Sequence, residues 1–293
     1  MSRSGQASFK IFCWLSALIP MLCVVALLAF LAARGLPTVS AALFFGDTQP
    51  LAALLGRAPV WDGIWPAFAG TLSLVLLSAA VAIPVGVACG IHLAEFATDR
   101  SKAALSLGAD LLAGVPSIVM GLFGFALILL LRRTLLPNAT TCLLLSAACM
   151  ALLILPYLIK TTQASLEGLP EELRLLGPSL GLTRLQAIRH ILLPAAGKGI
   201  LGGAVLAIGR AAEDTAVILL TGVVANAGLP RGLLDKYEAL PFYIFTTAAE
   251  HQTVGELDRG FGAALVLLLL TSGIFLGAHL LHAAMQRRWR TSA

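Results

Sequence analysis

Six long runs of apolar residues divide this chain, and they constrain its fold more than any other feature. A helix needs about 20 apolar residues to cross the hydrocarbon core of a bilayer, and each run is close to that length. Together the runs take up much of the 293 residues, so the sequence predicts an all-α integral membrane protein with six transmembrane helices. The runs are Ile11 to Ala33, Ala67 to Ile91, Leu111 to Leu131, Thr140 to Ile159, Gly199 to Val224 and Phe261 to Leu281.

The charge content agrees with a membrane protein. Only 12% of the residues are charged, whereas soluble domains carry about 25%, which disfavours soluble enzymes, disordered regulators and nucleic-acid binders. The net charge of +5 is therefore better explained by membrane orientation than by a nucleic-acid partner. All five cysteines lie in apolar runs, without a C-x-x-C pair or a histidine at ligand spacing, so neither a disulfide nor a metal site is predicted.

The first apolar run predicts an uncleaved helix, because it is longer than the roughly 7–15 apolar residues of a signal peptide. Lys and Arg are more numerous in the loops on the side of the N-terminus, although Arg132 and Arg133 oppose this bias. The positive-inside rule therefore predicts that both termini are cytoplasmic. The predicted divisions are a cytoplasmic N-terminus (1–10), a first transmembrane helix (11–34), an external loop (35–66), a core of five transmembrane helices (67–284) and a cytoplasmic tail (285–293).

The longest predicted cytoplasmic segment, residues 161–198, separates the fourth and fifth runs. Pro170 suits a first helical position, and the two glutamates after it suit the positive end of a helix. Leucines then recur at helical spacing, which predicts a short amphipathic helix: Leu173, Leu176 and Leu180. Such a helix either lies on the membrane face or docks a cytosolic partner.

The residues after this helix resemble the cytoplasmic signature of ABC importer permeases, which reads Glu-Ala-Ala, three residues, Gly, nine residues and Ile-x-Leu-Pro. The last four fixed positions are matched, whereas Leu175-Leu176-Gly177 stands where the family has Glu-Ala-Ala. The resemblance implies a coupling loop seated in a cleft of an ATPase subunit. Its candidate residues are Leu175, Gly177, Gly181, Ile191, Leu193 and Pro194.

Further segments are similar to phosphate importer permeases of the Pst type. They are residues 62–72 with the following Ala82-Ile-Pro-Val-Gly86 and His92-Leu-Ala-Glu-Phe96, residues 114–124 (Gly-Val-Pro-Ser-Ile-Val-Met-Gly-Leu-Phe-Gly) and residues 209–216 (Gly-Arg-Ala-Ala-Glu-Asp-Thr-Ala). The last segment resembles the family pattern R-A-x-G-E-T-A. The resemblance implies a MetI-like permease core, here made by the second to sixth runs.

Three charged residues, Arg210, Glu213 and Asp214, lie inside the fifth run. Ionisable residues are costly within a membrane and are candidate functional groups. Both acids follow Arg210 at helical spacing, so a structural ion pair is one interpretation. The other is an anion relay, in which Arg210 offers paired donors to phosphate and Asp214 holds it when the path is empty. The resemblance places Arg210 and Asp214 on the Arg and Glu of the family pattern, and Glu213 on a family Gly.

Three hydroxyl residues complete the predicted substrate pathway. Ser117 follows Pro116, and a proline in a membrane helix frees a carbonyl and can open a polar notch. A plain helix kink is the alternative there. Thr71 and Thr215 are weaker candidates, for which helix packing is the alternative.

The chain contains no G-x-x-x-x-G-K-[ST] motif, so we expect a transport subunit and not an enzyme, with no catalytic residue, metal or cofactor of its own. Gly177-Pro-Ser-Leu-Gly181 fits the hydrolase pattern G-x-S-x-G but lacks the strand that this motif needs. The resemblance implies the permease subunit of a phosphate importer in the plasma (bacterial inner) membrane. It also implies four partner proteins besides the bilayer: two cytosolic ATPase subunits that hydrolyse ATP, a second homologous permease and an external phosphate-binding protein.

Two alternatives remain open at the level of sequence. The same architecture could import another oxyanion, such as molybdate, tungstate, sulfate or phosphonate. A proton-driven secondary transporter would instead use Glu213 and Asp214 as its relay, and inverted repeats would favour that class.

Overall fold

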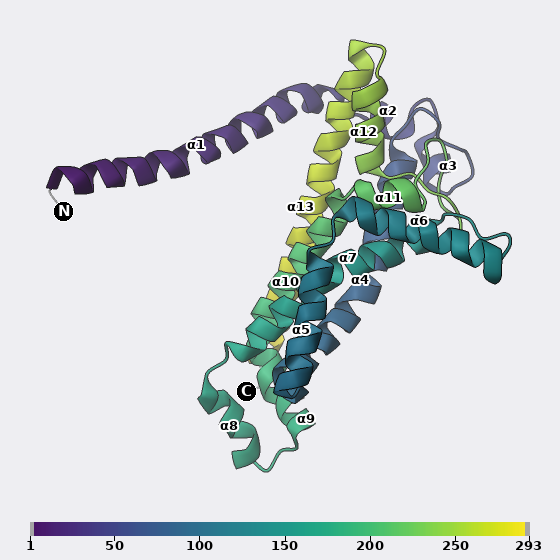
Figure 1. The fold of residues 1–293 in the computed structure, drawn as a ribbon. Helices are drawn as coiled ribbons and strands as arrows, with labels where there is room; N and C mark the ends of the chain where they lie inside the picture. The colour runs from purple at the N-terminus through teal and green to yellow at the C-terminus, as the bar shows by residue number, and fades with distance from the viewer. Residues whose placement is uncertain (1–2, 291–293) are drawn as a thin grey trace.

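A central helix, α7 (Leu143–Glu167), organises the helical bundle. The computed structural model describes residues 3–290; residues 1–2 of the predicted N-terminal segment and 291–293 of the predicted tail lie outside the described residues. α7 packs along α4 (Trp65–Ile91) and α10 (Leu193–Glu213) (Figure 1). Close packing depends on glycines: a Cβ at Gly90 of α4 would lie 2.5 Å from the Cβ of Thr162 of α7. Small residues of this kind let membrane helices approach closely.

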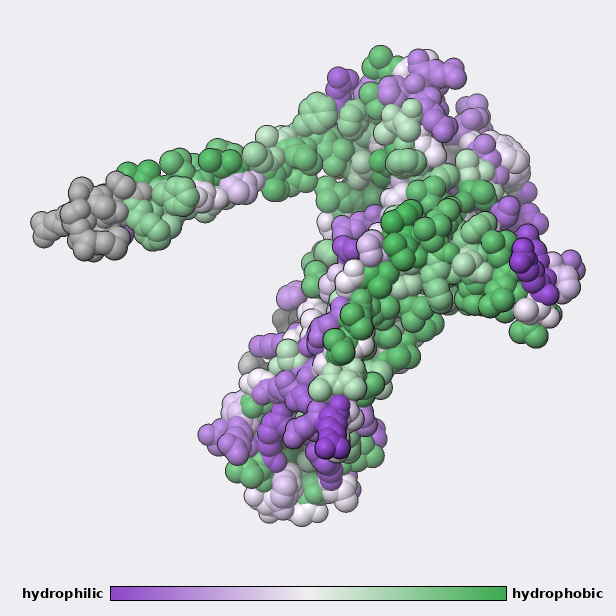
Figure 2. Space-filling view, in the orientation of Figure 1, coloured by the Kyte–Doolittle hydropathy of each residue, from purple (hydrophilic) through white to green (hydrophobic). Residues whose placement is uncertain are grey.

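Six helical stretches are long and apolar enough to cross a bilayer, as the sequence predicts. Figure 2 shows an apolar surface over the bundle, with hydrophilic residues gathered at the end that carries α8 and α9 and at the end that carries α12. Within residues 3–290 there is no strand, only an isolated bridge between Val223 and Tyr237. The all-α membrane class is confirmed. The stretches are Phe9–Thr38, Trp65–Phe96, Ser117–Thr134, Leu143–Glu167, Arg184–Glu213 and Val254–Gly277.

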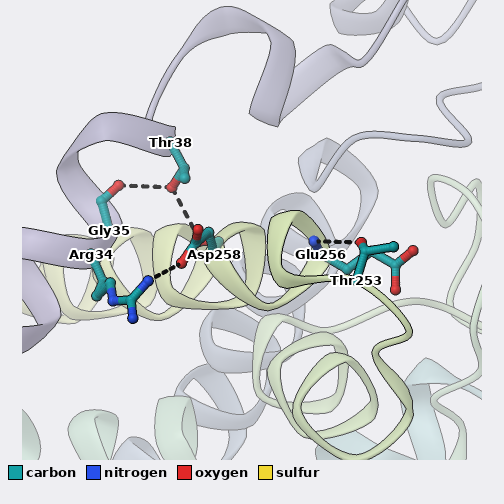
Figure 3. Close-up of polar contacts among 6 residues, drawn as sticks. All are labelled: Arg34, Gly35, Thr38, Thr253, Glu256 and Asp258. Atoms are coloured by element: carbon teal, nitrogen blue, oxygen red, sulfur yellow. Dashed lines mark hydrogen bonds and ion pairs between the residues drawn. The ribbon is translucent and has the colours of Figure 1, made fainter.

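The first helix, α1 (Arg3–Gly35), projects away from the bundle (Figure 1). It meets the start of α13 (Val254–Arg290) near its own C-terminal end. There the Phe30 ring packs edge-on against Phe261, with centroids 5.5 Å apart. Figure 3 shows the polar side of this junction, where Arg34 pairs with Asp258 at 3.2 Å.

Two of the predicted transmembrane runs are broken helices. The third run begins in α5 (Asp99–Ala113), breaks at residues 114–116 and resumes in α6 (Ser117–Thr134). Pro116 explains this break, because proline disfavours helical conformation at the residue before it. The fifth predicted run, Gly199 to Val224, is not one continuous helix, because it is broken next to its charged residues. α10 ends at Glu213, Asp214 is extended, and α11 (Ala216–Thr221) follows.

The long loops contain short helices. Residues 35–66 include η1 (Leu36–Thr38), α2 (Ala41–Phe45) and α3 (Pro50–Leu54), and residues 225–259 include α12 (Leu240–Glu250).

The opposite end holds η2 (His92–Phe96), α8 (Glu171–Ser179), α9 (Arg184–Ala187) and η3 (Ile188–Leu192). The amphipathic helix predicted after Pro170 is therefore present as α8. Pro170 itself is the N-cap and not the first helical residue.

Candidate functional site

The helices that follow the two breaks, α6 and α11, lie parallel to each other. Gly121 of α6 lies against α11, since a Cβ there would be 3.0 Å from the Ala216 carbonyl oxygen. One turn further, a Cβ at Gly124 would be 2.7 Å from the Cγ2 of Thr221. α6 and α11 therefore run side by side in the same direction, and their N-terminal ends adjoin. The structure thus brings the Ser117 end of α6 to the break at Asp214 and Thr215.

Arg210 lies one turn before the break and is exposed. Its guanidinium carbon is 5.9 Å from the ring centroid of Tyr157, within the range of a cation–π contact. Among the described residues Arg210 forms no ion pair with Glu213 or Asp214. The structural ion pair that the spacing suggests is therefore not formed.

Within the part of the chain that the structure describes, the Asp214 carboxylate hydrogen-bonds to the backbone of the next helix and forms no ion pair with Arg210. Its Oδ1 accepts a hydrogen bond from the Val217 amide at 3.0 Å, so the carboxylate caps the start of α11. Because the chain leaves the helix at Asp214, the spacing of four residues no longer places this acid beside Arg210. Glu213 ends α10 and is exposed.

The hydroxyl candidates divide into two groups. Ser117, the first residue of α6, and Thr215, just before α11, are half-buried at the breaks. Thr71 is fully buried in α4, where its Oγ1 donates to the Ala67 carbonyl and accepts from the Leu240 amide, each at 2.8 Å. Thr71 therefore fastens α12 to α4, and the helix-packing alternative holds for it.

The Gly181 region of the predicted coupling loop forms a tight helix stop. Gly181 has φ +69°, and the amides of Gly181 and Leu182 donate to the carbonyls of Pro178 and Gly177, both at 3.0 Å. This is the Schellman arrangement, in which glycine takes the left-handed position. An L-residue with a side chain would raise the conformational free energy by about 1–2 kcal/mol at this position. Gly177 has a packing role, because a Cβ there would be 2.5 Å from the Cβ of Ala187 in α9.

The rest of the loop is anchored on one side and exposed on the other. Ile191 and Leu193 pack against a small buried cluster formed by Leu166, Ile188, Leu192 and Ala196. Pro194 occupies the first turn of α10, where the lack of an N–H is tolerated. Leu175 is 59% exposed. The G-x-S-x-G pattern places Ser179 at the end of α8, so the strand that a nucleophile elbow needs is not there.

Sequence reasoning missed the ion pairs at this end, and the most buried of them joins α8 to η2. Arg174 of α8 contacts Glu95 of η2, with Nη1 and Oε1 2.7 Å apart. The partners are 79 residues apart in sequence, so no helical spacing could have indicated the contact. The signal in the residues themselves was an acid, Glu95, four residues after the end of an apolar run.

Comparison with known proteins places these features in a wider group. Residues 82–291 match the family described as "Binding-protein-dependent transport system inner membrane component". The phosphate transport system permease protein PstA 1 of Mycobacterium tuberculosis is 33% identical over 78% of this chain and 72% of its own length. A probable phosphate transport system permease protein PstA of Methanocaldococcus jannaschii is 28% identical over 73% of each chain.

A solved structure supports the fold. A chain of the MetNI methionine ABC transporter, crystallised in inward-facing conformations, superposes with a TM-score of 0.56 at 16% identity. The match covers 81% of this chain and 98% of that chain. The identity is low, so the similarity concerns the arrangement of helices alone.

Proposed function

The chain belongs to the binding-protein-dependent transport system inner membrane components, and from this we propose that it is the permease subunit of an ATP-driven importer of inorganic phosphate. It is a multi-pass membrane permease, with six stretches able to span a bilayer. Relatives from Mycobacterium tuberculosis, Mycobacterium leprae and Methanocaldococcus jannaschii carry the name of phosphate transport permeases. These names support phosphate as the cargo.

The observation that carries the proposal is the exposed guanidinium of Arg210 beside two helix breaks. Guanidinium presents planar, paired donors that match a phosphate oxyanion. The first amides of α6 have no partner within their own helix, and they add the positive end of the helix dipole near the same break. Ser117 and Thr215 supply hydroxyl groups there. Because Asp214 is engaged in capping α11, it leaves the guanidinium available to an anion.

The remaining assignments follow the family and the two ends of the bundle. One of the two cytosolic ATPase subunits docks on the coupling loop (161–198) of this chain, where apolar side chains are exposed: Leu175, Leu176, Leu180 and Leu185. Leu175 and Leu176 stand at the Glu-Ala-Ala front of the family signature, so this contact is apolar where the family has an acid. The ATPases hydrolyse ATP, and this chain holds no cofactor and catalyses no reaction.

A second permease completes the pathway. Arg210 and Glu213 are exposed on the surface of this subunit, so a second subunit is needed to enclose them. A phosphate-binding protein docks on segments 35–66 and 225–259 at the α12 end. This arrangement keeps both termini in the cytoplasm and the permease core at residues 67–284.

The alternative cargo is another oxyanion in the same architecture. Its support is Glu213, an exposed acid three residues from Arg210 that stands where the pattern of phosphate importer permeases has Gly. A proton relay through Glu213 and Asp214 is less well supported, since the Asp214 carboxylate is hydrogen-bonded to the backbone of α11.

The test is uptake of radiolabelled phosphate by the reconstituted complex, with sulfate and molybdate as competitors. Arg210→Lys should lower uptake about tenfold or more, because an ammonium cannot reproduce a two-pronged contact. Arg133→Lys, an exposed arginine at the end of α6, is the matched control and should transport normally. Glu213→Gly should keep or improve phosphate uptake. If Glu213→Gly lost uptake while Arg210→Lys transported normally, the acids and not Arg210 would be the groups needed for transport. The proposed phosphate site at Arg210 would then be wrong.

A further inference from the structure

The two helices of the coupling loop, α8 and α9, both contact η2, the short turn at the end of α4. Arg174 of α8 donates to Glu95 at 2.7 Å, and Arg184 of α9 lies over the Phe96 ring, with its guanidinium carbon 4.8 Å from the centroid. Glu95 and Phe96 are neighbours in η2. Two cationic side chains from separate elements therefore converge on two consecutive residues.

Arg174 joins three elements at once. Its Nη1 contacts Glu95 of η2, and its Nη2 donates at 2.6 Å to the carbonyl of Leu166, in the last turn of α7. A planar guanidinium can hold both acceptors in fixed directions, which an ammonium cannot. The Arg174 side chain thus links α8 to the ends of α4 and α7.

The burial of this pair distinguishes it from the more exposed ion pair of Asp110 and Lys160 at the same end. The side chains of Glu95 and Arg174 are 8% and 29% exposed. Those of Asp110 and Lys160, paired at 2.9 Å, are 61% and 37% exposed. Solvent screens exposed pairs strongly and they contribute little, whereas loss of one partner of a buried pair leaves a charge without compensation.

The local backbone is arranged for this contact. η2 is a π-turn, closed by a hydrogen bond of 2.9 Å from the Ala97 amide to the His92 carbonyl. A π-turn is wider than an α-turn and is often found at functional sites. The adjoining residues Ile91 and Ala94 pack on the same buried cluster as the start of α10. At its cytoplasmic-loop end, α4 is therefore joined to the coupling loop by non-covalent contacts and not by the backbone.

Chain connectivity shows why such contacts are needed. α8 follows α7 after three residues, and α9 continues through η3 into α10. Motion of the loop is passed to α7 and α10 by the backbone, but α4 has no such link. We propose that Glu95 and Arg174 are positioning residues that pass motion of the coupling loop to α4. The proposal rests on the proposed function, because it takes the loop as the contact with the ATPases.

The test measures phosphate imported per ATP hydrolysed by the reconstituted complex in proteoliposomes. Glu95→Gln and Arg174→Gln should each lower this ratio about tenfold, within the 5- to 150-fold span of ordinary coupling between sites, while ATP hydrolysis continues. Arg174→Lys should fall between these variants and the unaltered complex. The exchange Glu95→Arg with Arg174→Glu should recover part of the ratio, which a loss of folding would not allow. Asp110→Asn, which breaks the exposed pair with Lys160, is the matched control and should leave the ratio unchanged.

Three results would count against the proposal. An unchanged ratio in both Gln variants would show that the pair does not transmit motion. A ratio lowered equally by Asp110→Asn would show a general effect of charge. Loss of the ATPases from the purified complex in the Gln variants would show that the pair only maintains assembly. A separate variant, Leu175→Arg, tests the proposed function itself. If the coupling loop is the contact with the ATPases, this variant should lose them during purification. If the ATPases are retained, the loop is not that contact and the proposed function fails.

Discussion

α1 and α7 are both able to span a membrane, yet they are built into the molecule in opposite ways. The most apolar window of α1 has a mean hydropathy of 2.6 and is 0% buried, whereas that of α7 has a mean hydropathy of 2.1 and is 67% buried. The more hydrophobic helix is the less buried one. Hydropathy therefore indicates that a helix lies in the bilayer and not that it lies inside the protein.

The composition of the two helices explains the difference. α7 buries small and polar side chains, including Ser146, Ala147 and Thr162, which let neighbouring helices approach or form hydrogen bonds. α1 instead exposes large side chains along its length, such as Phe12, Trp14 and Met21. Lipid tails are as apolar as leucine, so large apolar side chains give a helix no preference for protein over lipid. α1 thus presents a surface suited to lipid or to the second permease proposed above.

The largest expected contrast comes from adding volume to each helix surface. Gly90→Leu inserts a side chain where a Cβ alone would lie 2.5 Å from Thr162 and 2.8 Å from the Ile159 carbonyl. Overpacking against backbone should cost about 3 kcal/mol or more, so we expect little folded protein. Ala26→Leu, on the exposed surface of α1, should leave thermal unfolding in detergent unchanged. Equal yields of the two variants would mean that α4 and α7 are not in close contact.

Removal of volume should give a smaller contrast of the same sign. Leu158 of α7 is fully buried, so Leu158→Ala should destabilise the subunit by about 2 kcal/mol through lost packing. Leu18 of α1 is 47% exposed, and Leu18→Ala should have no measurable effect on the unfolding midpoint of the isolated subunit. If Leu18→Ala destabilised the isolated subunit as much as Leu158→Ala, the projecting position of α1 would be wrong.

The sequence identified the spans better than their ends and interruptions. The apolar run from Thr140 to Ile159 predicted α7, but the helix continues to Glu167 because packing holds it beyond its apolar part. Pro116 signalled the break before α6. Nothing equally strong signalled the break at Asp214, where the flanking residues are compatible with a helix. The cause is a local hydrogen bond from the Val217 amide to the Asp214 carboxylate.

For the candidate site, local geometry was more predictable than long-range contacts. The left-handed Gly181 agrees with the turn that a glycine after a helical pattern indicates. The ion pair expected within the 210–214 segment did not form, since a spacing rule assumes a continuous helix. The burial of Thr71 and the contact of Glu95 with Arg174 depend on elements far apart in sequence. Such contacts follow from the packed fold and not from any local pattern.

The smallest expected effect concerns the junction that joins α1 to the rest of the molecule (Figure 3). Arg34 and Asp258 are 3.2 Å apart, with side chains 51% and 29% exposed. The Thr38 hydroxyl also donates to the Gly35 carbonyl at 2.8 Å and to the Asp258 carbonyl at 3.3 Å. An exposed pair of this kind contributes about 0.2–1 kcal/mol and weakens with salt. Asp258→Asn should therefore barely change the unfolding midpoint at low salt and not at all at high salt.

The angle of α1 should respond more than stability does, because few other contacts hold the helix. Spin labels on residue 18 of α1 and residue 269 of α13 should give a broader distance distribution in Asp258→Asn than in the unaltered chain. The hydrogen bond from the Thr38 hydroxyl to the Asp258 backbone carbonyl survives the substitution, so the mean distance should stay the same. A large loss of stability with an unchanged distance distribution would mean that α1 is integrated into the bundle as α7 is. The contrast between the two helices would then be lost.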